Sequence, residues 1–163
     1  MRRTHFTVLL VCEGYAEDQL VCVIRDAYLP RGCGVVLQRQ NARGNSGARA
    51  LELAIELKPQ TAHDVHAVMI DTDADWGDEQ RGRAAHHKIV VLENSPCLEA
   101  TLLQVDGYKL SRPGRSPKSL FEEQFGGPAH RPNLIRRHFP KEKFDAARAH
   151  VPVIAQLLEL IRC

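Results

Sequence analysis

The stretch FTVLLVCEGYAEDQLVCVIRDAY (residues 6–28) decides the fold class. Its first part, FTVLLVC (residues 6–12), is short, rich in β-branched residues and apolar throughout, which is typical of a strand buried on both faces. In its second part apolar residues recur at helical spacing, and Glu17 and Asp18 fall in the first turn, where acidic side chains complement the helix dipole. The pattern therefore predicts a buried strand that is followed directly by a helix, which Pro30 ends.

The same alternation repeats along the chain. Further strands are predicted over residues 34–39, 64–70 and 88–92. Helices are predicted over residues 48–57 and from about Cys97, with Ser95 as the cap and Pro96 in the first turn. Strands that alternate with helices in this way predict an α/β fold with a mostly parallel four-stranded sheet and helices on both faces.

The chain changes character after Val105. A loop rich in Gly, Pro, Arg and Ser leads to a predicted short helix over residues 119–125 and then to a final helical region, in which Pro152 is expected to kink or restart the helix. Apolar residues recur there in steps of three and four: Phe144, Ala147, Val151, Ile154, Leu158 and Ile161. We expect this stripe to pack on the sheet, with a homodimer seam as the alternative. Residues 1–106 would then form the core, and residues 107–163 a basic helical extension packed on it within a single domain.

The composition limits the classes of protein to which the chain can belong. The chain has 163 residues, of which 44% are hydrophobic and 26% charged, and this fits one globular domain. No window approaches the roughly 18 uninterrupted apolar residues of a membrane span, so we expect a cytoplasmic protein. The five cysteines are widely spaced and form no CxxC pair, which favours buried thiols over disulfides or a zinc site.

Charge is unevenly distributed along the chain. The formal net charge is only +2, but residues 107–143 contain nine Lys or Arg residues against three Glu residues. Such a segment is typical of a phosphate-binding surface, and a solvated basic loop is the alternative.

Acidic residues follow the predicted strands at the points where the strands end. Glu13 follows the first strand, and Asp71, Asp73 and Asp75 come at the end of the third, while Glu99 follows the fourth. The carboxyl ends of parallel strands meet at one edge of a sheet, and residues i and i+2 of an extended segment point the same way. Clustered carboxylates with water and phosphate as further ligands suit Mg²⁺ or Mn²⁺. The alternative is that the aspartates only support a turn or cap helices.

Three motifs resemble those of the TOPRIM fold, which is shared by topoisomerases, bacterial primases, recombination proteins and several small nucleases. The motif VCEGYAEDQLV (residues 11–21) is similar to the TOPRIM glutamate motif, and MIDTDAD (residues 69–75) to its Asp-x-Asp motif. The stretch ENSPCLEATLL (residues 93–103) resembles a motif of RloB-like proteins, a TOPRIM group that is linked to restriction and phage-defence loci and is related to OLD-family nucleases.

The resemblance implies roles for individual residues. Glu13, Asp71 and Asp73 would be catalytic: Glu13 as a general acid or base and a metal ligand, and the two aspartates as ligands of Mg²⁺ or Mn²⁺. Asp75 and Glu99 would be secondary ligands. The activity implied is a metal-dependent nuclease that cleaves DNA or RNA, with a separately encoded ATPase as partner. The basic residues expected to contact nucleic-acid phosphates are Lys118, Arg136, Arg137, Lys141 and Lys143.

The sequence is also compatible with two other functions. The basic segment favours a non-catalytic module that binds nucleic acid or a partner protein. So does the departure from the RloB-like pattern after Glu99, where Ala100 and Thr101 stand in place of a tryptophan-containing sequence. The third and weaker alternative is phosphotransfer or hydrolysis on a small nucleotide, because the same carboxylates could serve a triphosphate.

Overall fold

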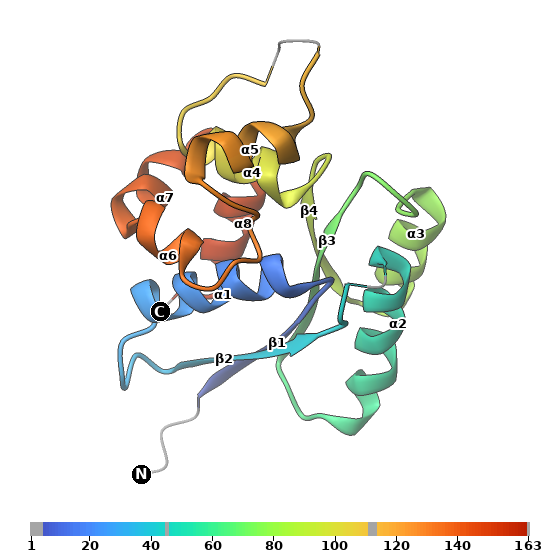
Figure 1. Cartoon of the computed structure of the whole chain (residues 1–163). Coiled ribbons are helices and arrows are strands. Elements are labelled where there is room, and N and C mark those ends of the chain that lie inside the picture. Colours follow the sequence, from blue (N-terminus) through green and yellow to red (C-terminus); the bar gives the residue numbers. More distant parts are fainter. Residues whose placement is uncertain (1–4, 45, 111–113, 163) are drawn as a thin grey trace.

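A four-stranded parallel sheet forms the centre of the computed structural model, which describes residues 5–44, 46–110 and 114–162 (Figure 1). The strands are β1 (Phe6–Cys12), β2 (Val35–Asn41), β3 (Val65–Asp71) and β4 (Val90–Asn94). They are ordered β2-β1-β3-β4, and each neighbouring pair is parallel. The predicted α/β architecture is confirmed.

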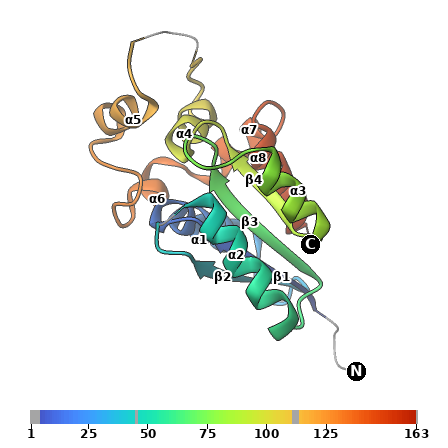
Figure 2. The same ribbon diagram turned by 90° about the vertical axis from the view of Figure 1, so that its right-hand side faces the viewer.

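Helices cover both faces of the sheet (Figures 1 and 2). One face is covered by α2 (Gly47–Leu57), which ends in a short 3₁₀ turn, and by α3 (Asp78–His86). The opposite face carries α1 (Tyr15–Tyr28) and the C-terminal helices, which are α4 (Leu98–Val105), α5 (Pro117–Phe125), α6 (Leu134–His138), α7 (Lys141–Ala147) and α8 (Pro152–Leu160).

The central strand β1 is buried on both faces, as its apolar sequence predicts. Val8, Leu10 and Cys12 belong to the core under α1 and the C-terminal helices, whereas Val11 belongs to the core under α2 and α3. All four of these side chains are 0% exposed. Alternation of side chains along an extended strand therefore supplies both cores from one short segment.

The apolar stripe of the C-terminal region packs inward. All six of its residues are buried and belong to the same core as β1, so the expected packing on the sheet is confirmed and the alternative of a homodimer seam formed by this stripe is wrong. Pro152 restarts the helix, because α7 ends at Ala147 and α8 begins at Pro152. A proline is tolerated there because the first helical N–H has no partner within a helix.

The bounds of β2, β3 and α5 differ from the predicted ones by one or two residues, and three local features differ in other ways. β4 begins at Val90, two residues late, because Lys88 adopts a positive φ of 53° in the turn that follows α3. Helix α3 was not predicted, since Ala84 is its only buried residue and its sequence shows no apolar stripe. The predicted cap of α4 is wrong: Cys97 occupies the N-cap position, and Ser95 and Pro96 lie before it, joined by a cis peptide bond.

The cysteines of the described region are all free thiols. Cys12 and Cys97 are buried and Cys22 and Cys33 are half-buried, while Cys163 lies outside the described residues. None of the described helices has the length and apolar character that a membrane crossing requires.

Candidate functional site

Two acidic residues predicted to form a site meet at the carboxyl ends of adjacent strands. Glu13 directly follows β1, and Asp71 is the last residue of β3. The strands are tied together at this point, since the Glu13 N–H donates to the Met69 carbonyl at 3.0 Å. The Asp71 N–H in turn donates to Glu13 Oε2 at 2.8 Å, which orients the glutamate carboxylate.

These residues line a pocket of about 320 Å³. The pocket combines the carboxylate that follows β1 with others from α1, β3 and α4, and it adds a lysine and a histidine from the C-terminal region. Its lining residues are Glu13, Gly14, Tyr15, Ala16, Glu17, Gly44, Asp71, Glu99, Lys118 and His130. The fold thus brings Glu13, which follows the first strand, into the same pocket as His130, which lies in the loop before α6.

Burial and neighbouring carboxylates raise the pKa values of Asp71, Glu17 and Glu13. Burial is the largest cause for Asp71, and the charges of Glu17, Glu13 and Glu99 add to it, so that its pKa is raised to about 9. Burial and the charge of Glu13 raise the pKa of Glu17 to about 7. The pKa of Glu13 is also raised by burial, although the hydrogen bond from Asp71 opposes the change. Negative charge at this site is therefore unfavourable without a cation.

Glu17 was missed as a site residue by the sequence analysis, which assigned it to the helix dipole alone. Its side chain is 5% exposed, and Oε2 accepts a hydrogen bond from the Gly14 N–H at 3.0 Å at the start of α1. The spacing between Gly14 and Glu17 is that of a capping box, which was the signal available in the sequence.

A second loop approaches the site beside Gly14. A Cβ at Gly14 would lie 3.2 Å from Glu17 Oε2 and 3.5 Å from the Gly44 Cα. The Gly44 N–H donates to the Glu13 carbonyl at 2.7 Å, so the loop after β2 is fastened to the end of β1. The distance to Gly44 is an ordinary van der Waals contact, whereas a Cβ at Gly14 would require the Glu17 carboxylate to shift by a few tenths of an ångström.

The two other aspartates after β3 lie at the margin of the site. β3 ends at Asp71 and residues 72–75 form a bend, so the extended geometry that was expected to align Asp71 with Asp73 is not present. Asp73 still lies near enough to raise the pKa of Asp71, and its Oδ2 is 3.7 Å from Lys118 Nζ. Asp75 Oδ2 accepts from the Ala48 N–H at 3.4 Å, which places that carboxylate at the start of α2.

Of the five basic residues that were predicted to contact phosphates, Lys118 lines the pocket. It lies in the first turn of α5, and the nearby charges of Glu99 and Asp73 raise its pKa, against the opposing effect of burial. His130, from the loop before α6, was not predicted, because a lone histidine in a Gly- and Pro-containing loop gives no sequence signal.

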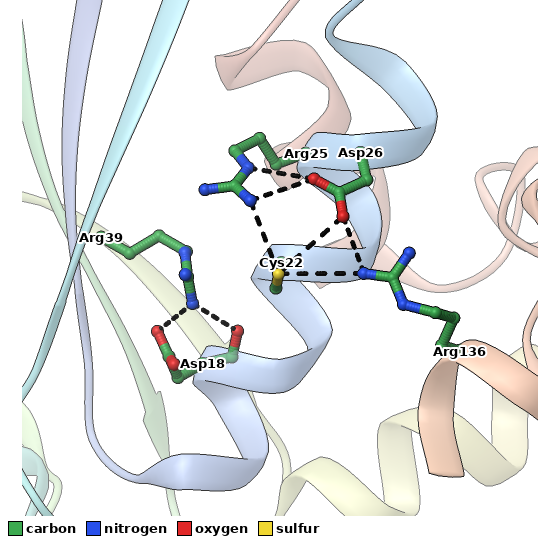
Figure 3. Close-up of polar contacts among 6 residues, drawn as sticks. All are labelled: Asp18, Cys22, Arg25, Asp26, Arg39 and Arg136. Carbon is green, nitrogen blue, oxygen red and sulfur yellow. Dashed lines mark hydrogen bonds and ion pairs between the residues drawn. The ribbon is translucent and has the colours of Figure 1, made fainter. Parts of the chain in front are cut away.

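The remaining predicted nucleic-acid contacts lie elsewhere. Arg136 Nη2 donates to Asp26 Oδ2 at 2.7 Å, beside the Cys22 thiol on α1, as Figure 3 shows. Lys141 pairs with Asp145 at 2.9 Å and lies over the Tyr28 ring.

Two more of the basic residues that were predicted to contact nucleic acid also lie away from the pocket. Lys143 is bound to Asp106 and lies over the Phe139 ring. Arg137 is exposed on α6. None of the four residues Arg136, Arg137, Lys141 and Lys143 lines the carboxylate pocket.

The donor set of the pocket is the kind that hard divalent cations bind. Within residues 5–44, 46–110 and 114–162, no three His, Cys, Asp or Glu side chains are arranged so that they already form a metal site. Four mutually repelling carboxylates nevertheless share this one pocket, and their oxygens match the ligand preference of Mg²⁺ and Mn²⁺. The chemistry of the residues fits such an ion, with water and phosphate oxygens as the remaining ligands.

Comparison with known proteins identified no relative: no protein-family description, no curated protein and no solved structure matches the chain.

Proposed function

We propose that the chain is a Mg²⁺- or Mn²⁺-dependent phosphodiesterase of the TOPRIM type that hydrolyses DNA or RNA. The observation that carries this proposal is the pocket at the carboxyl ends of β1 and β3, which Glu13, Asp71 and Glu99 line together with Lys118. Acidic groups for a cation and a basic group for a phosphate are thus present within one small volume. This combination suits phosphoryl chemistry.

Glu13, Asp71 and Glu99 would hold the cation, with Asp73 as a ligand at the rim. The raised pKa values of Glu13 and Asp71 support this assignment, because burial and the neighbouring carboxylates make the charged forms of both groups unfavourable in the absence of a cation. A bound divalent cation offsets that charge, polarises the phosphoryl group and lowers the pKa of bound water.

Glu13 is the general base of the proposed reaction. The Asp71 N–H holds Oε2 and so leaves Oε1 to accept a proton from the water that attacks phosphorus. The new bond joins the water oxygen to phosphorus, and the bond from phosphorus to the leaving oxygen breaks. The proton taken by Glu13 is returned to solvent, and the leaving oxygen is protonated by water.

Lys118 and Tyr15 would bind the substrate. The Lys118 ammonium group lines the pocket beside the carboxylates and is suited to a non-bridging phosphate oxygen. The Tyr15 ring lines the same pocket and is 60% exposed, which makes it a surface on which a base can stack. Their positions support a substrate that contains both a phosphate and a base.

A small nucleotide is the second candidate substrate. Arg136, Lys141 and Lys143 are engaged in ion pairs with acidic residues and lie outside the pocket. They therefore do not form a basic track that leads a long strand into the site. This distribution of charge is the observation that favours a nucleotide over a long strand as the substrate, and it gives no support to the non-catalytic nucleic-acid module. A separately encoded ATPase in a restriction or phage-defence system stays a prediction from the resemblance.

The experiment begins with the metal alone. Mg²⁺ and Mn²⁺ are titrated into the wild type and into Asp71→Asn by calorimetry, and hydrolysis is then measured on single- and double-stranded DNA and RNA and on nucleoside triphosphates. We expect metal binding and metal-dependent hydrolysis by the wild type and neither by Asp71→Asn. Asp78→Asn is the matched control, because its fully exposed carboxylate on α3 lies away from the pocket.

The outcomes separate the candidate functions. Cleavage of polymer supports the nuclease, and turnover of nucleotide without cleavage of polymer supports the second candidate. Full metal-dependent hydrolysis by Asp71→Asn would overturn both. Salt-sensitive binding of nucleic acid that EDTA leaves unchanged, with no hydrolysis of any substrate, would support the non-catalytic module.

A further inference from the structure

The ammonium group of Lys118 lies among the carboxylates that would hold a cation. Lys118 lines the same pocket as Glu13, Asp71 and Glu99, and its Nζ atom is 3.7 Å from Asp73 Oδ2 at the rim. Burial lowers the pKa of Lys118, but the charges of Glu99, Asp73 and Asp71 outweigh burial, so that the pKa is raised. The lysine is therefore held as a cation by the groups that a divalent cation would also need.

The backbone of Lys118 is fixed, whereas its side chain can move. Lys118 lies in the first turn of α5, and the Ser116 side chain caps this helix by accepting from the Ser119 N–H at 3.1 Å. The Phe121 ring of α5 is 0% exposed and stacks against the ring of Phe139. The start of α5 is thus anchored in the core, and the four-carbon stem of the lysine is the flexible part.

The contact between Lys118 and Asp73 is one that can exchange. The two side chains are 57% and 38% exposed, and ion pairs between such exposed groups are weak. Asp73 lies in the bend of residues 72–75 that follows β3 and not in the strand itself. Lys118 can therefore leave Asp73 with little loss of free energy.

The lysine compensates only part of the negative charge in the pocket. Burial raises the pKa of Glu13, and the charge of Lys118 opposes this only in part. Burial and the charges of Glu17 and Glu13 raise the pKa of Asp71 to about 9. Charge remains unfavourable at the inner carboxylates with the ammonium group in place, so a divalent cation is attracted more strongly than the single charge of Lys118.

We propose that Lys118 is a built-in counter-ion of this site and that a divalent cation displaces it from Asp73 on binding. The inference rests on the proposed function and adds a form of regulation to it. In the metal-free protein the ammonium group neutralises the rim carboxylate. Once displaced, the same group is free to bind a phosphate oxygen, so that the metal has to bind before Lys118 becomes available to the substrate.

Calorimetric titration of the full chain with Mg²⁺ alone and with Mn²⁺ alone tests this competition without any substrate. Lys118→Met removes the ammonium group and keeps a side chain of similar length, and we expect the affinity for each metal to rise by about three- to tenfold. Lys118→Arg keeps the positive charge and should bind the metals no more tightly than the wild type. Lys141→Met is the matched control, because Lys141 pairs with Asp145 outside the pocket, and it should leave the affinity unchanged.

A double-mutant cycle separates displacement from simple repulsion between a lysine and a metal ion. Asp73→Asn removes the carboxylate from which Lys118 has to be displaced. In that background Lys118→Met should change the metal affinity by less than about twofold. The same gain in affinity with and without the charge of Asp73 would overturn the proposal. The single variants carry the test if Asp73→Asn binds the metals too weakly to measure.

The outcomes distinguish this inference from the proposed function. Metal binding by the wild type with unchanged affinity in Lys118→Met would overturn the inference and leave the proposed function in place. No metal binding by either protein would overturn both. Tighter binding by Lys118→Met, or binding by that variant alone, supports the inference. Circular dichroism checks that the variants are folded, which we expect because the Lys118 side chain lies outside the core.

Discussion

The backbone N–H of Asp71 donates to the carboxylate of Glu13 at 2.8 Å, so the last residue of β3 orients the acidic residue that follows β1. The two residues are 58 positions apart in the sequence. Their contact depends on the parallel pairing of β1 with β3, which aligns Cys12 with Met69. The candidate site is thus built on the sheet itself and not on a mobile loop.

Asp71→Asn should abolish metal-dependent hydrolysis while the fold is retained. The substitution keeps the size of the side chain and its acceptor oxygen, to which the Leu98 N–H donates at 3.0 Å. It removes the negative charge that a cation requires, and we expect activity to fall by about 10²–10³-fold or more. Steady-state rates at saturating Mg²⁺, with Asp78→Asn as the control, measure this; unchanged rates would exclude Asp71 as a ligand.

The thermal stability of the metal-free protein should fall as the pH rises from about 5 to about 9. Burial and the charges of Glu17 and Glu13 raise the pKa of Asp71 to about 9, whereas an unfolded aspartate has a pKa of about 3.9. The folded state therefore keeps a proton that the unfolded state has lost. This contribution to stability is complete below about pH 4 and is lost as the pH rises through the folded pKa.

Melting temperatures in EDTA across this pH range, for the wild type and Asp71→Asn, isolate the effect. The variant lacks the titrating group and should show a flatter dependence on pH. For a domain of this size a loss of 1 kcal/mol lowers the melting temperature by roughly 2–4 °C. Parallel curves for the two proteins would show that Asp71 does not carry the dependence. Added Mg²⁺ should raise the melting temperature of the wild type alone.

Glu17 should have separable roles in capping and in charge. Glu17→Gln keeps an oxygen that can accept from the Gly14 N–H, and it removes one of the charges that raise the pKa of Asp71. Glu17→Ala removes both the acceptor oxygen and the charge. The lost cap should lower the free energy of unfolding by about 0.5–2 kcal/mol. Urea denaturation at pH 8 without metal should therefore rank Glu17→Gln as more stable than Glu17→Ala. The reverse order would argue against the capping role.

Lys118→Met should weaken substrate binding with little change in stability. A hydrogen bond to a charged group contributes about 1.5–3 kcal/mol, which corresponds to a fall in kcat/KM of about 10–100-fold. Lys141→Met is the matched control, since Lys141 pairs with Asp145 outside the pocket. Equal losses for the two lysines would indicate a diffuse electrostatic effect and not a contact in the pocket.

Phe139→Ala should destabilise the whole chain, because the C-terminal region shares the core of the sheet. The Phe139 side chain is 1% exposed and contacts the rings of Phe121, Phe125 and Phe144. Loss of such a ring costs about 3–5 kcal/mol. Urea unfolding followed by fluorescence and circular dichroism should show one transition at a lower midpoint. Two separate transitions would mean that residues 107–163 unfold independently.

The sequence by itself determined the strands and most of the helices. The uninterrupted apolar run over residues 6–12 predicted a strand buried on both faces, and the spacing of the C-terminal stripe predicted which side of its helices is buried. Both predictions were possible because these patterns are local and periodic. The positions of Glu13 and Asp71 after apolar strands predicted that both lie at the carboxyl edge of the sheet, but their convergence follows only from the pairing of β1 with β3 in the structure. Helix α3 escaped prediction because its sequence is polar almost throughout and buries only Ala84.

Only the tertiary structure decided which charges belong to the site. In the sequence, Lys118 and Arg136 look alike, but Lys118 lines the carboxylate pocket and Arg136 pairs with Asp26, 110 residues away. Glu17 looked like an ordinary first-turn residue until the fold placed it beside Glu13 and Asp71. The physical reason is that strands and helices follow from local periodicity, whereas the partner of a charged side chain depends on which distant segments the fold brings into contact.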